Sequence, residues 1–400
     1  MPAAPGRPPG GGARLGPRAV AGALLGLAVV VAAALFLHAR LTVPPPAPLK
    51  TTGVGLTPLA FSEIEGWEED DHGAALETLR RSCLDGASRD GTPFHRVCRR
   101  LAEVPANAER DAARSFFEHN FAPFALEPPG NEGAPGLLTG YYEPVIPGSR
   151  ERTERFTTPL YRLPQGHVVV TDGNRPEDFD PALVAGREEG DRIVAYPTRG
   201  EIEAGALADE LEPLVWLENP VEAFFVHVQG STRIALPDGS TMRIGYAGKT
   251  GHPYTSIGRH MREAGIEPPG GLGMTGLRGY LLAHPEEGRE IMAVNRSFIF
   301  FREVEGLSDE LGPVGAEGVP LTAKRSIAVD DTLYDYGLPI FVDADFGPLG
   351  RFRQLTIAQD TGSAIRGVAR GDIFWGTGPE AGEEAGQIQA PARFVALLPL

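Results

Sequence analysis

The chain opens with a basic stretch that leads into one long apolar run. Residues 1–18 contain three arginines and no acidic residue, and residues 19–37 are all apolar or glycine. As a helix rising about 1.5 Å per residue, this run would extend about 28 Å, enough to cross the hydrocarbon core of a bilayer. We therefore predict a transmembrane segment over residues 19–37, with residues 1–18 in the cytoplasm and the body of the chain exported.

Two features bear on whether this segment is removed after export. The apolar run is longer than the roughly 7–15 residues usual for a signal peptide, and its small-residue site, Leu37-His38-Ala39, is a poor cleavage sequence. We favour an uncleaved anchor, with a cleaved signal peptide as the alternative. No cysteine lies near the segment, so we expect no lipid-modified N-terminus. The proline-rich residues 38–55 then predict an extended linker.

Hydrophobic periodicity divides the exported body into two parts. Between residues 61 and 121, apolar positions recur three and four residues apart with charged residues between them, which predicts helices. Beyond residue 130, short β-branched and aromatic runs predict strands over residues 167–170, 223–228, 242–246, 297–301, 339–342 and 354–358. Two further helices are predicted over residues 255–264 and 275–294. The body is therefore expected to be a helical cap on one or two β-rich domains.

Composition agrees with a loop-rich β architecture and narrows the class of partner. Gly 51 and Pro 37 together are 88 of 400 residues, about twice their usual share. Hydrophobic residues at 42% and charged residues at 22% exclude a wholly disordered chain. The formal net charge of −16 opposes electrostatic binding to nucleic acid, so we predict no nucleic-acid partner.

The sequence has two cysteines, Cys83 and Cys98. In an exported body we predict that they form a disulfide, and closing a loop of 15 residues would stabilise the fold by about 3 kcal/mol. Two buried free thiols are the alternative. Zinc would require a set of His and Cys at ligand spacing around them, and we identify none.

Several short motifs resemble known sites without the context that their chemistry needs. Residues 271–276 spell GxGxxG, but no strand precedes them, so we interpret them as a loop entering a helix with Thr275 as N-cap. Residues 360–362 spell Asp-Thr-Gly, but a single-chain aspartic protease needs a second such triplet, which the chain lacks. No HxH, HExxH or GxSxG pattern occurs. We therefore predict no cofactor and no metal.

Three aspartates near the C-terminus are the best candidates for chemistry. Asp330, Asp360 and Asp372 each lie against a predicted strand rather than in a run of charges. A turn or cap is the ordinary role of such a residue, but strands of one small barrel would bring all three to one cleft. Asp372 precedes Ile-Phe-Trp, and an apolar wall would raise its carboxyl pKa so that it holds a proton near neutral pH, as a general acid must. A neighbouring Asp360 would raise that pKa further.

Six motifs in order resemble the membrane-bound lytic murein transglycosylase A family and cover roughly residues 60–397. They are LTGYYEP at 138–144, YPTRGEI at 196–202, VHVQGS at 226–231, RIGYAGK at 243–249, NRSFIFF at 295–301 and the block 360–378. The last is similar to the 3D domain, named for its three aspartates. Ser363 stands where glycine is common in that block, and Asp331 beside Asp330 leaves two candidates for the third acid.

The resemblance implies a mainly β fold with N-terminal helices. It implies a discontinuous double-psi β-barrel domain plus an inserted second β-barrel domain, with a groove between them for a glycan strand. We expect residues 56–143 to form the helical cap and first part of domain 1, residues 144–290 the insert, and residues 291–400 the rest of domain 1.

The family also implies an enzyme that cleaves the β-1,4 bond between N-acetylmuramic acid and N-acetylglucosamine and leaves 1,6-anhydromuramic ends. Asp372 matches the catalytic acid, supported by Asp360 and Asp330. The expected sugar contacts are Thr139, Gly140, Tyr141, Gln229, Gly230, Ser231, Tyr246 and Trp375, with Tyr142 as a further aromatic face. The alternative is a catalytically inactive peptidoglycan-binding scaffold.

The same resemblance places the protein in the periplasm of a Gram-negative bacterium. We expect peptidoglycan glycan strands as the substrate partner and the inner membrane as the partner of residues 19–37. A cell-wall synthesis or division complex is a candidate protein partner.

Overall fold

The computed structural model describes residues 54–84, 93–127, 130 and 133–400. The predicted cytoplasmic stretch 1–18, the predicted membrane segment 19–37 and nearly all of the linker at 38–55 lie outside these residues. Among the residues described, no helix is both long enough and apolar enough to span a bilayer. The structure therefore bears on the body of the chain.

The helices predicted between residues 61 and 121 are confirmed. They are α2 (His72–Leu84), α3 (Pro93–Leu101) and α4 (Arg110–Asn120), preceded by the short 3-10 helix η1 (Phe61–Glu63). On α2, Leu76 and Leu79 are fully buried three residues apart and pack into the main hydrophobic core. A disulfide joins Cys83 near the end of α2 to Cys98 on α3, in the pairing that the sequence predicts.

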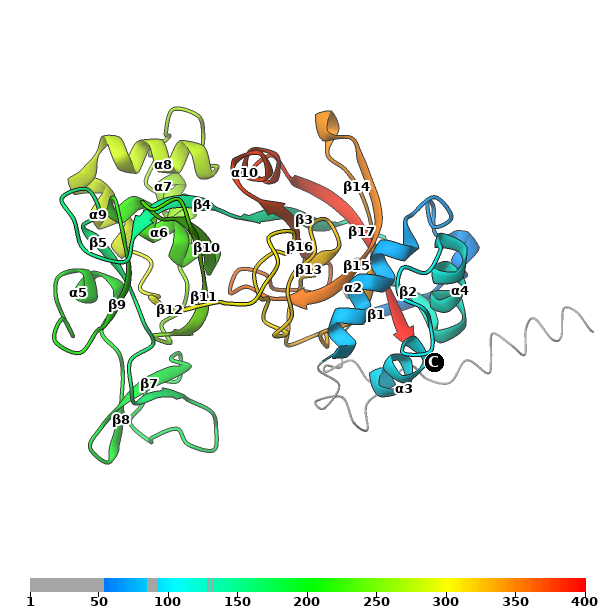
Figure 1. Cartoon of the computed structure of the whole chain (residues 1–400), viewed down its shortest axis with the longest axis horizontal. Coiled ribbons are helices and arrows are strands. Elements are labelled where there is room, and N and C mark those ends of the chain that lie inside the picture. Colours follow the sequence, from blue (N-terminus) through cyan, green and yellow to red (C-terminus); the bar gives the residue numbers. More distant parts are fainter. Residues whose placement is uncertain (1–53, 85–92, 128–129, 131–132) are drawn as a thin grey trace, which may run out of the picture. The chain divides into compact units, whose positions relative to one another are not determined.

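Behind the cap lies an eight-stranded sheet in the order β1-β2-β17-β14-β15-β13-β16-β3. Its strands are β1 (Gly55–Pro58), β2 (Phe121–Glu127), β3 (Gly136–Glu143), β13 (Ser326–Ala328), β14 (Pro339–Asp345), β15 (Arg351–Asp360), β16 (Arg370–Thr377) and β17 (Gln389–Pro399). Because β17 also pairs with β3, the strands from β17 through β14 to β3 form a closed ring (Figure 1). This barrel has no free edge between those strands, and β3 is contributed by a chain segment far from the others.

A second sheet has the order β12-β11-β10-β4-β9-β5. Its strands are β4 (Val145–Ser149), β5 (Thr158–Tyr161), β9 (Pro213–Leu217), β10 (Ser231–Ala235), β11 (Thr241–Lys249) and β12 (Ile299–Glu303). An isolated bridge between Arg162 and Phe301 joins its two ends. A small third sheet consists of β6 (His167–Val169), β7 (Ala185–Glu189) and β8 (Arg192–Val194). Since β12 pairs with β11, the second sheet extends past residue 290, where we expected the insert to end.

The remaining helices lie between and after these strands. They are α5 (Arg199–Glu203), α6 (Pro220–Gln229), α7 (Ile257–Glu263), α8 (Met274–Ala283), α9 (Pro285–Ala293) and α10 (Pro379–Ala385), with the 3-10 helix η3 (Gly347–Leu349). The helix predicted over 275–294 is two helices, because Pro285 starts a new one after His284. Thr275 is not an N-cap as predicted, since α8 begins after Gly273.

The strand predicted over residues 223–228 is wrong, because this segment belongs to α6. Asn219 caps the helix by accepting a hydrogen bond from the Glu222 backbone, and Pro220 follows at the first turn. The apolar run misleads because α6 is buried on two sides. Val221 and Phe224 pack in one hydrophobic cluster, whereas Ala223 and Val226 pack in another. A helix buried on two sides carries no helical alternation of polar and apolar residues.

Candidate active site

Asp372 lies in the middle of the barrel wall, where two parallel strands bring it next to a threonine. In the pairing of β16 with β3, Asp372 is opposite Thr139. The Thr139 hydroxyl donates to Oδ1 of Asp372 at 2.5 Å and accepts a hydrogen bond from Nη2 of Arg370 at 2.8 Å. Arg370 precedes Asp372 by two positions, so strand alternation places the two side chains on one face of β16. The arginine thus acts on the carboxyl through the hydroxyl.

Burial raises the pKa of Asp372, so that the carboxyl can hold a proton closer to neutral pH. Burial in the barrel wall raises its pKa to about 6, and the nearby charge of Asp360 adds to that rise. The hydrogen bond from Thr139 and the charge of Arg370 act in the opposite direction. A carboxyl group in this state can give a proton to a leaving oxygen and take one back.

Asp360, at the end of β15, is held by three donors. Tyr141 donates its hydroxyl to Oδ2 at 2.7 Å, and the backbone N–H groups of Ala316 and Thr361 donate to Oδ1 at 3.0 and 2.9 Å. Burial raises the pKa of Asp360, and these hydrogen bonds oppose the rise. Burial and the charge of Asp360 raise the pKa of Tyr141 well above its usual value, so its phenol remains a donor. The Tyr141 ring lies 5.5 Å from that of Phe374, which shares the face of Asp372.

Asp330 has different surroundings although it follows the neighbouring strand β13. Its Oδ1 accepts from Thr332 Oγ1 at 2.7 Å and Arg366 Nη1 at 3.1 Å, and its Oδ2 accepts from the Gly367 backbone at 2.8 Å. Burial alone would raise its pKa, but the hydrogen bonds from Gly367 and Thr332 and the charge of Arg366 together lower it. Asp331 is more exposed and bonds Arg366 at 2.8 Å. Asp330 is therefore the more buried of the two candidates for the third acid.

Trp375 does not share the face of Asp372, contrary to our expectation of a sugar contact. Its side chain is 7% exposed and packs against the rings of Phe346 and Phe352, and its indole N–H donates to Glu384 on α10 at 2.5 Å. Successive strand residues point to opposite faces, so Trp375 points away from the face that Asp372 and Phe374 share. This burial and orientation argue against Trp375 as a sugar contact.

The other expected sugar contacts fall in three places. Gly140 lies between Thr139 and Tyr141 on β3, where an added Cβ would come within 2.9 Å of Ile388, so close packing accounts for this glycine. Gln229, Gly230 and Ser231 lie where α6 ends and β10 begins. Tyr246 on β11 is 48% exposed, which leaves its ring free to contact a ligand.

A pocket of about 680 Å³ lies away from the three aspartates. Its lining includes Tyr142 on β3, Gln229 and Phe225 on α6, and Met274 on α8, together with residues of α10. Tyr142 and Tyr141 are neighbours on β3 and so point to opposite faces. The pocket therefore opens on one face of β3 and the aspartate site on the other. We base the chemistry on the aspartate geometry, because the pocket lining contains none of the three acids.

Sequence reasoning missed Arg370 and the backbone donor at Ala316. Arg370 could have been found from strand alternation, since it lies two positions before Asp372. Ala316 carries no such signal, because a long loop brings it to Asp360 from 44 residues away. In the part of the chain that the structure describes, no group of three or more His, Cys, Asp or Glu side chains is arranged to hold a metal ion.

Known families match both parts of this fold. Residues 137–302 match the family described as "MltA specific insert domain", and residues 325–398 match the "3D domain". The insert match covers the second and third sheets apart from Glu303, and the 3D match contains all three aspartates. This pair of domains defines the MltA class of proteins.

Relatives across the whole body agree with that class. Membrane-bound lytic murein transglycosylase A of Escherichia coli (strain K12) is 33% identical over 283 residues, which are 67% of this chain and 68% of that protein. The crystal structure of a membrane-bound lytic murein transglycosylase from Agrobacterium tumefaciens has a TM-score of 0.78 and 34% identity, covering 86% of this chain and 98% of that one. Escherichia coli MltA with bound chitohexaose has a TM-score of 0.60 and 25% identity, covering 87% and 95%. The chain belongs to the membrane-bound lytic murein transglycosylase A family.

Proposed function

We propose that this protein is a lytic transglycosylase that cleaves the β-1,4 bond between N-acetylmuramic acid and N-acetylglucosamine in peptidoglycan. The observation that supports this most is the environment of Asp372, whose pKa of about 6 suits a group that both donates and accepts a proton. Family membership supports the substrate class, since the relatives are named for murein and one of them binds chitohexaose.

In the proposed reaction, Asp372 first acts as the acid. Because Thr139 donates to Oδ1, the acidic proton belongs on Oδ2, from which it passes to the bridging oxygen as the glycosidic bond breaks. Asp360 accepts three hydrogen bonds, which oppose the rise of its pKa on burial, and as a carboxylate it would favour the positive charge that develops at the anomeric carbon.

Asp372 then acts as the base. Its carboxylate takes the proton of the muramic C6 hydroxyl, whose oxygen attacks the anomeric carbon of the same sugar and closes a 1,6-anhydro ring. Two-carboxylate hydrolases use the second carboxylate to activate water or to attack the sugar. An internal nucleophile has a high effective concentration, so one acid can serve both steps. The proton balance closes, because Asp372 ends as it began.

We propose sugar contacts according to the exposure of each side chain and the hydrogen bonds that it already makes. Tyr246 offers the exposed ring, and Thr139 and Tyr141 lie beside the acids, although their hydroxyls already bond Asp372 and Asp360. Gln229, Gly230 and Ser231 would contact more distant sugars. We also propose that residues 19–37 tether the body to the inner membrane on the periplasmic side.

Digestion of purified peptidoglycan followed by mass spectrometry tests the function. We expect muropeptides with anhydromuramic ends, and we expect none from the Asp372→Asn variant. Intact sacculi that retain bound protein would instead support the inactive scaffold.

A further inference from the structure

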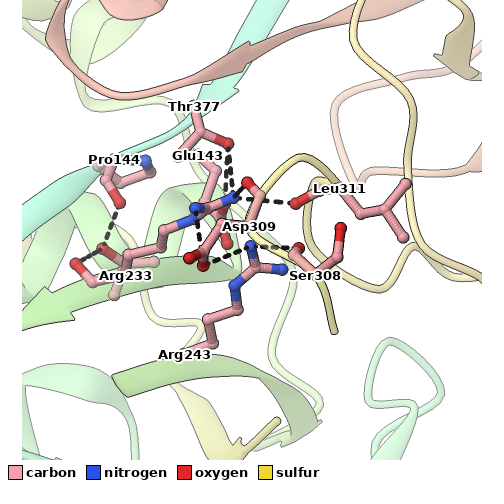
Figure 2. A network of polar contacts seen from close by, with 9 residues as sticks. Glu143, Pro144, Arg233, Arg243, Ser308, Asp309, Leu311 and Thr377 are labelled. Carbon is pink, nitrogen blue, oxygen red and sulfur yellow. Dashed lines mark hydrogen bonds and ion pairs between the residues drawn. The ribbon is translucent and has the colours of Figure 1, made fainter. Parts of the chain in front are cut away.

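The chain passes between the barrel and the second sheet at two places, and one arginine contacts both. β3 leads into β4 across Glu143 and Pro144, and the chain returns from β12 to β13 through residues 304–325. Arg233 lies on β10 of the second sheet, and its side chain is buried between these two segments (Figure 2). It is thus in a position to fix one sheet against the other.

Arg233 makes direct hydrogen bonds to both of these connecting segments. Nε of Arg233 donates to Oε2 of Glu143 at 2.7 Å, and its backbone N–H donates to the Pro144 carbonyl at 2.8 Å. On the returning segment, its Nη2 donates to the carbonyls of Asp309 and Leu311 at 3.0 and 2.9 Å. The planar guanidinium is needed for this set, because it directs several donors in fixed directions at once.

The joint, meaning Arg233 with its hydrogen bonds to the two connecting segments, is linked by Glu143 to the strands of the aspartate site. Oε2 of Glu143 also accepts a hydrogen bond from the hydroxyl of Thr377 at 2.9 Å (Figure 2). The backbone carbonyl of Glu143 accepts a hydrogen bond from the backbone N–H of Gly378 at 2.9 Å. Thr377 and Glu143 are the last pair in the β16–β3 register, beyond a bulge that follows Phe374. The same register pairs Asp372 with Thr139. The Glu143 carboxylate therefore bonds Thr377 at the last pair of the register that aligns Asp372 with Thr139, and it also bonds Arg233.

We propose that Arg233 is a positioning residue for the reaction at Asp372. It holds the second sheet, which carries Tyr246, against β3 and β16, so that a polysaccharide bound to both is presented with one glycosidic oxygen at the acid. This inference rests on the proposed function. Buried ion pairs are weak evidence of a gain in stability, whereas a misplacement of about 1 Å can cost about 100-fold in rate. Orientation is therefore the effect to test.

The test is Arg233→Lys, which keeps the charge and removes the fork of donors. We expect kcat on peptidoglycan strands to fall by about 10- to 100-fold. The pH at which kcat declines should stay that of the wild type, because Asp372 keeps Thr139 and Arg370. Without substrate, the Gly378 amide should exchange its hydrogen at least about tenfold faster, since its partner Glu143 has lost its anchor.

Arg325→Lys is the matched control. Arg325 forms a similarly buried pair with Asp70 at 2.9 Å, but Arg325 directly precedes β13 of the barrel and Asp70 lies two residues before α2 of the cap, so the pair does not reach the second sheet. This variant should lose stability to a similar extent, while kcat well below its unfolding temperature and exchange at Gly378 stay as in the wild type.

Three results would overturn the proposal. One is an Arg233→Lys enzyme with wild-type kcat, one is a shifted pH profile, which would mean that Arg233 acts on the acidity of Asp372, and one is unchanged exchange at Gly378. A wild-type chain that releases no anhydro ends contradicts the proposed function instead, and the exchange measurement still tests the joint.

Discussion

Asp372 lies on β16 and Asp330 lies just after the neighbouring strand β13, yet their surroundings move their pKa values in opposite directions. Ala328, two residues before Asp330, pairs with Asp372 across β13 and β16. Both carboxyls lose water on folding. Asp372 receives a hydrogen bond from Thr139, and its pKa rises to about 6, whereas Asp330 receives bonds from Thr332, Gly367 and Arg366, and its pKa falls.

The contrast shows that burial alone does not decide whether the pKa of a carboxyl rises. At Asp330 the hydrogen bonds from Gly367 and Thr332 and the charge of Arg366 together outweigh the loss of water, whereas at Asp372 the loss of water outweighs the Thr139 hydrogen bond and the charge of Arg370. Asp330 is compensated and so organises the loop beside Asp360. The charge of Asp372 is compensated less fully, and its raised pKa suits the proton transfer that we propose for it.

The largest effect is expected for Asp372→Asn, measured as turnover on peptidoglycan. Removing the proton donor should lower kcat by about 100- to 10,000-fold while the fold is kept. At pH 7 the variant should also be more stable, by up to about 3 kcal/mol, because the wild type carries a charge whose pKa folding has raised to about 6. That gain should disappear below about pH 4, where the carboxyl is protonated in both folded and unfolded states. Wild-type turnover in this variant would contradict the assignment.

Thr139→Val should give a smaller effect, with a defined direction in pH. The Thr139 hydrogen bond lowers the pKa of Asp372, so its loss should move the alkaline decline of kcat to higher pH. In the wild type, kcat should fall as pH rises through about 6, since the acid must be protonated. We expect kcat itself to fall by about tenfold. Thr57→Val, which removes a hydroxyl bonded to Glu127 on an outer strand, is the control and should leave the profile unchanged.

Asp330→Asn should affect stability far more than chemistry. An asparagine has one acceptor oxygen, so either Gly367 or the Thr332 and Arg366 donors lose their partner, at about 2 kcal/mol. The wild-type contribution of Asp330 is present above the unfolded pKa of about 4 and is lost as pH falls through its lower folded pKa, so the two proteins should converge in strong acid. Chemical denaturation at several pH values measures this. A 100-fold loss of kcat in the stably folded variant would make Asp330 part of the chemistry.

Much of the fold followed from local pattern. The helices before residue 121 and the strands at 242–246, 297–301, 339–342 and 354–358 have periodicities that their burial explains, and the motif order indicated the family. The segment 223–228 did not, because α6 packs between two clusters and its apolar positions carry no helical period. The double-psi topology of the barrel stays a prediction.

The site was predictable as a set of acids but not as a geometry. The sequence context of Asp372 and Asp360 indicates two acids beside predicted strands, and Trp375 is expected at the same site because it is adjacent in sequence. Strand alternation turns Trp375 to the other face. The ion pair between Arg233 and Glu143 joins residues 90 positions apart, and such long-range pairs leave no local signal in one sequence.

The most direct measurement is digestion of peptidoglycan in water enriched in heavy oxygen. If Asp372 works alone and the C6 hydroxyl is the nucleophile, no water enters the product. We therefore predict unlabelled anhydromuramic ends, one water lighter than a hydrolysis product. Heavy oxygen at the muramic C1 would show that water attacks, would contradict the single-acid mechanism, and would direct the search for a second carboxylate first to Asp360.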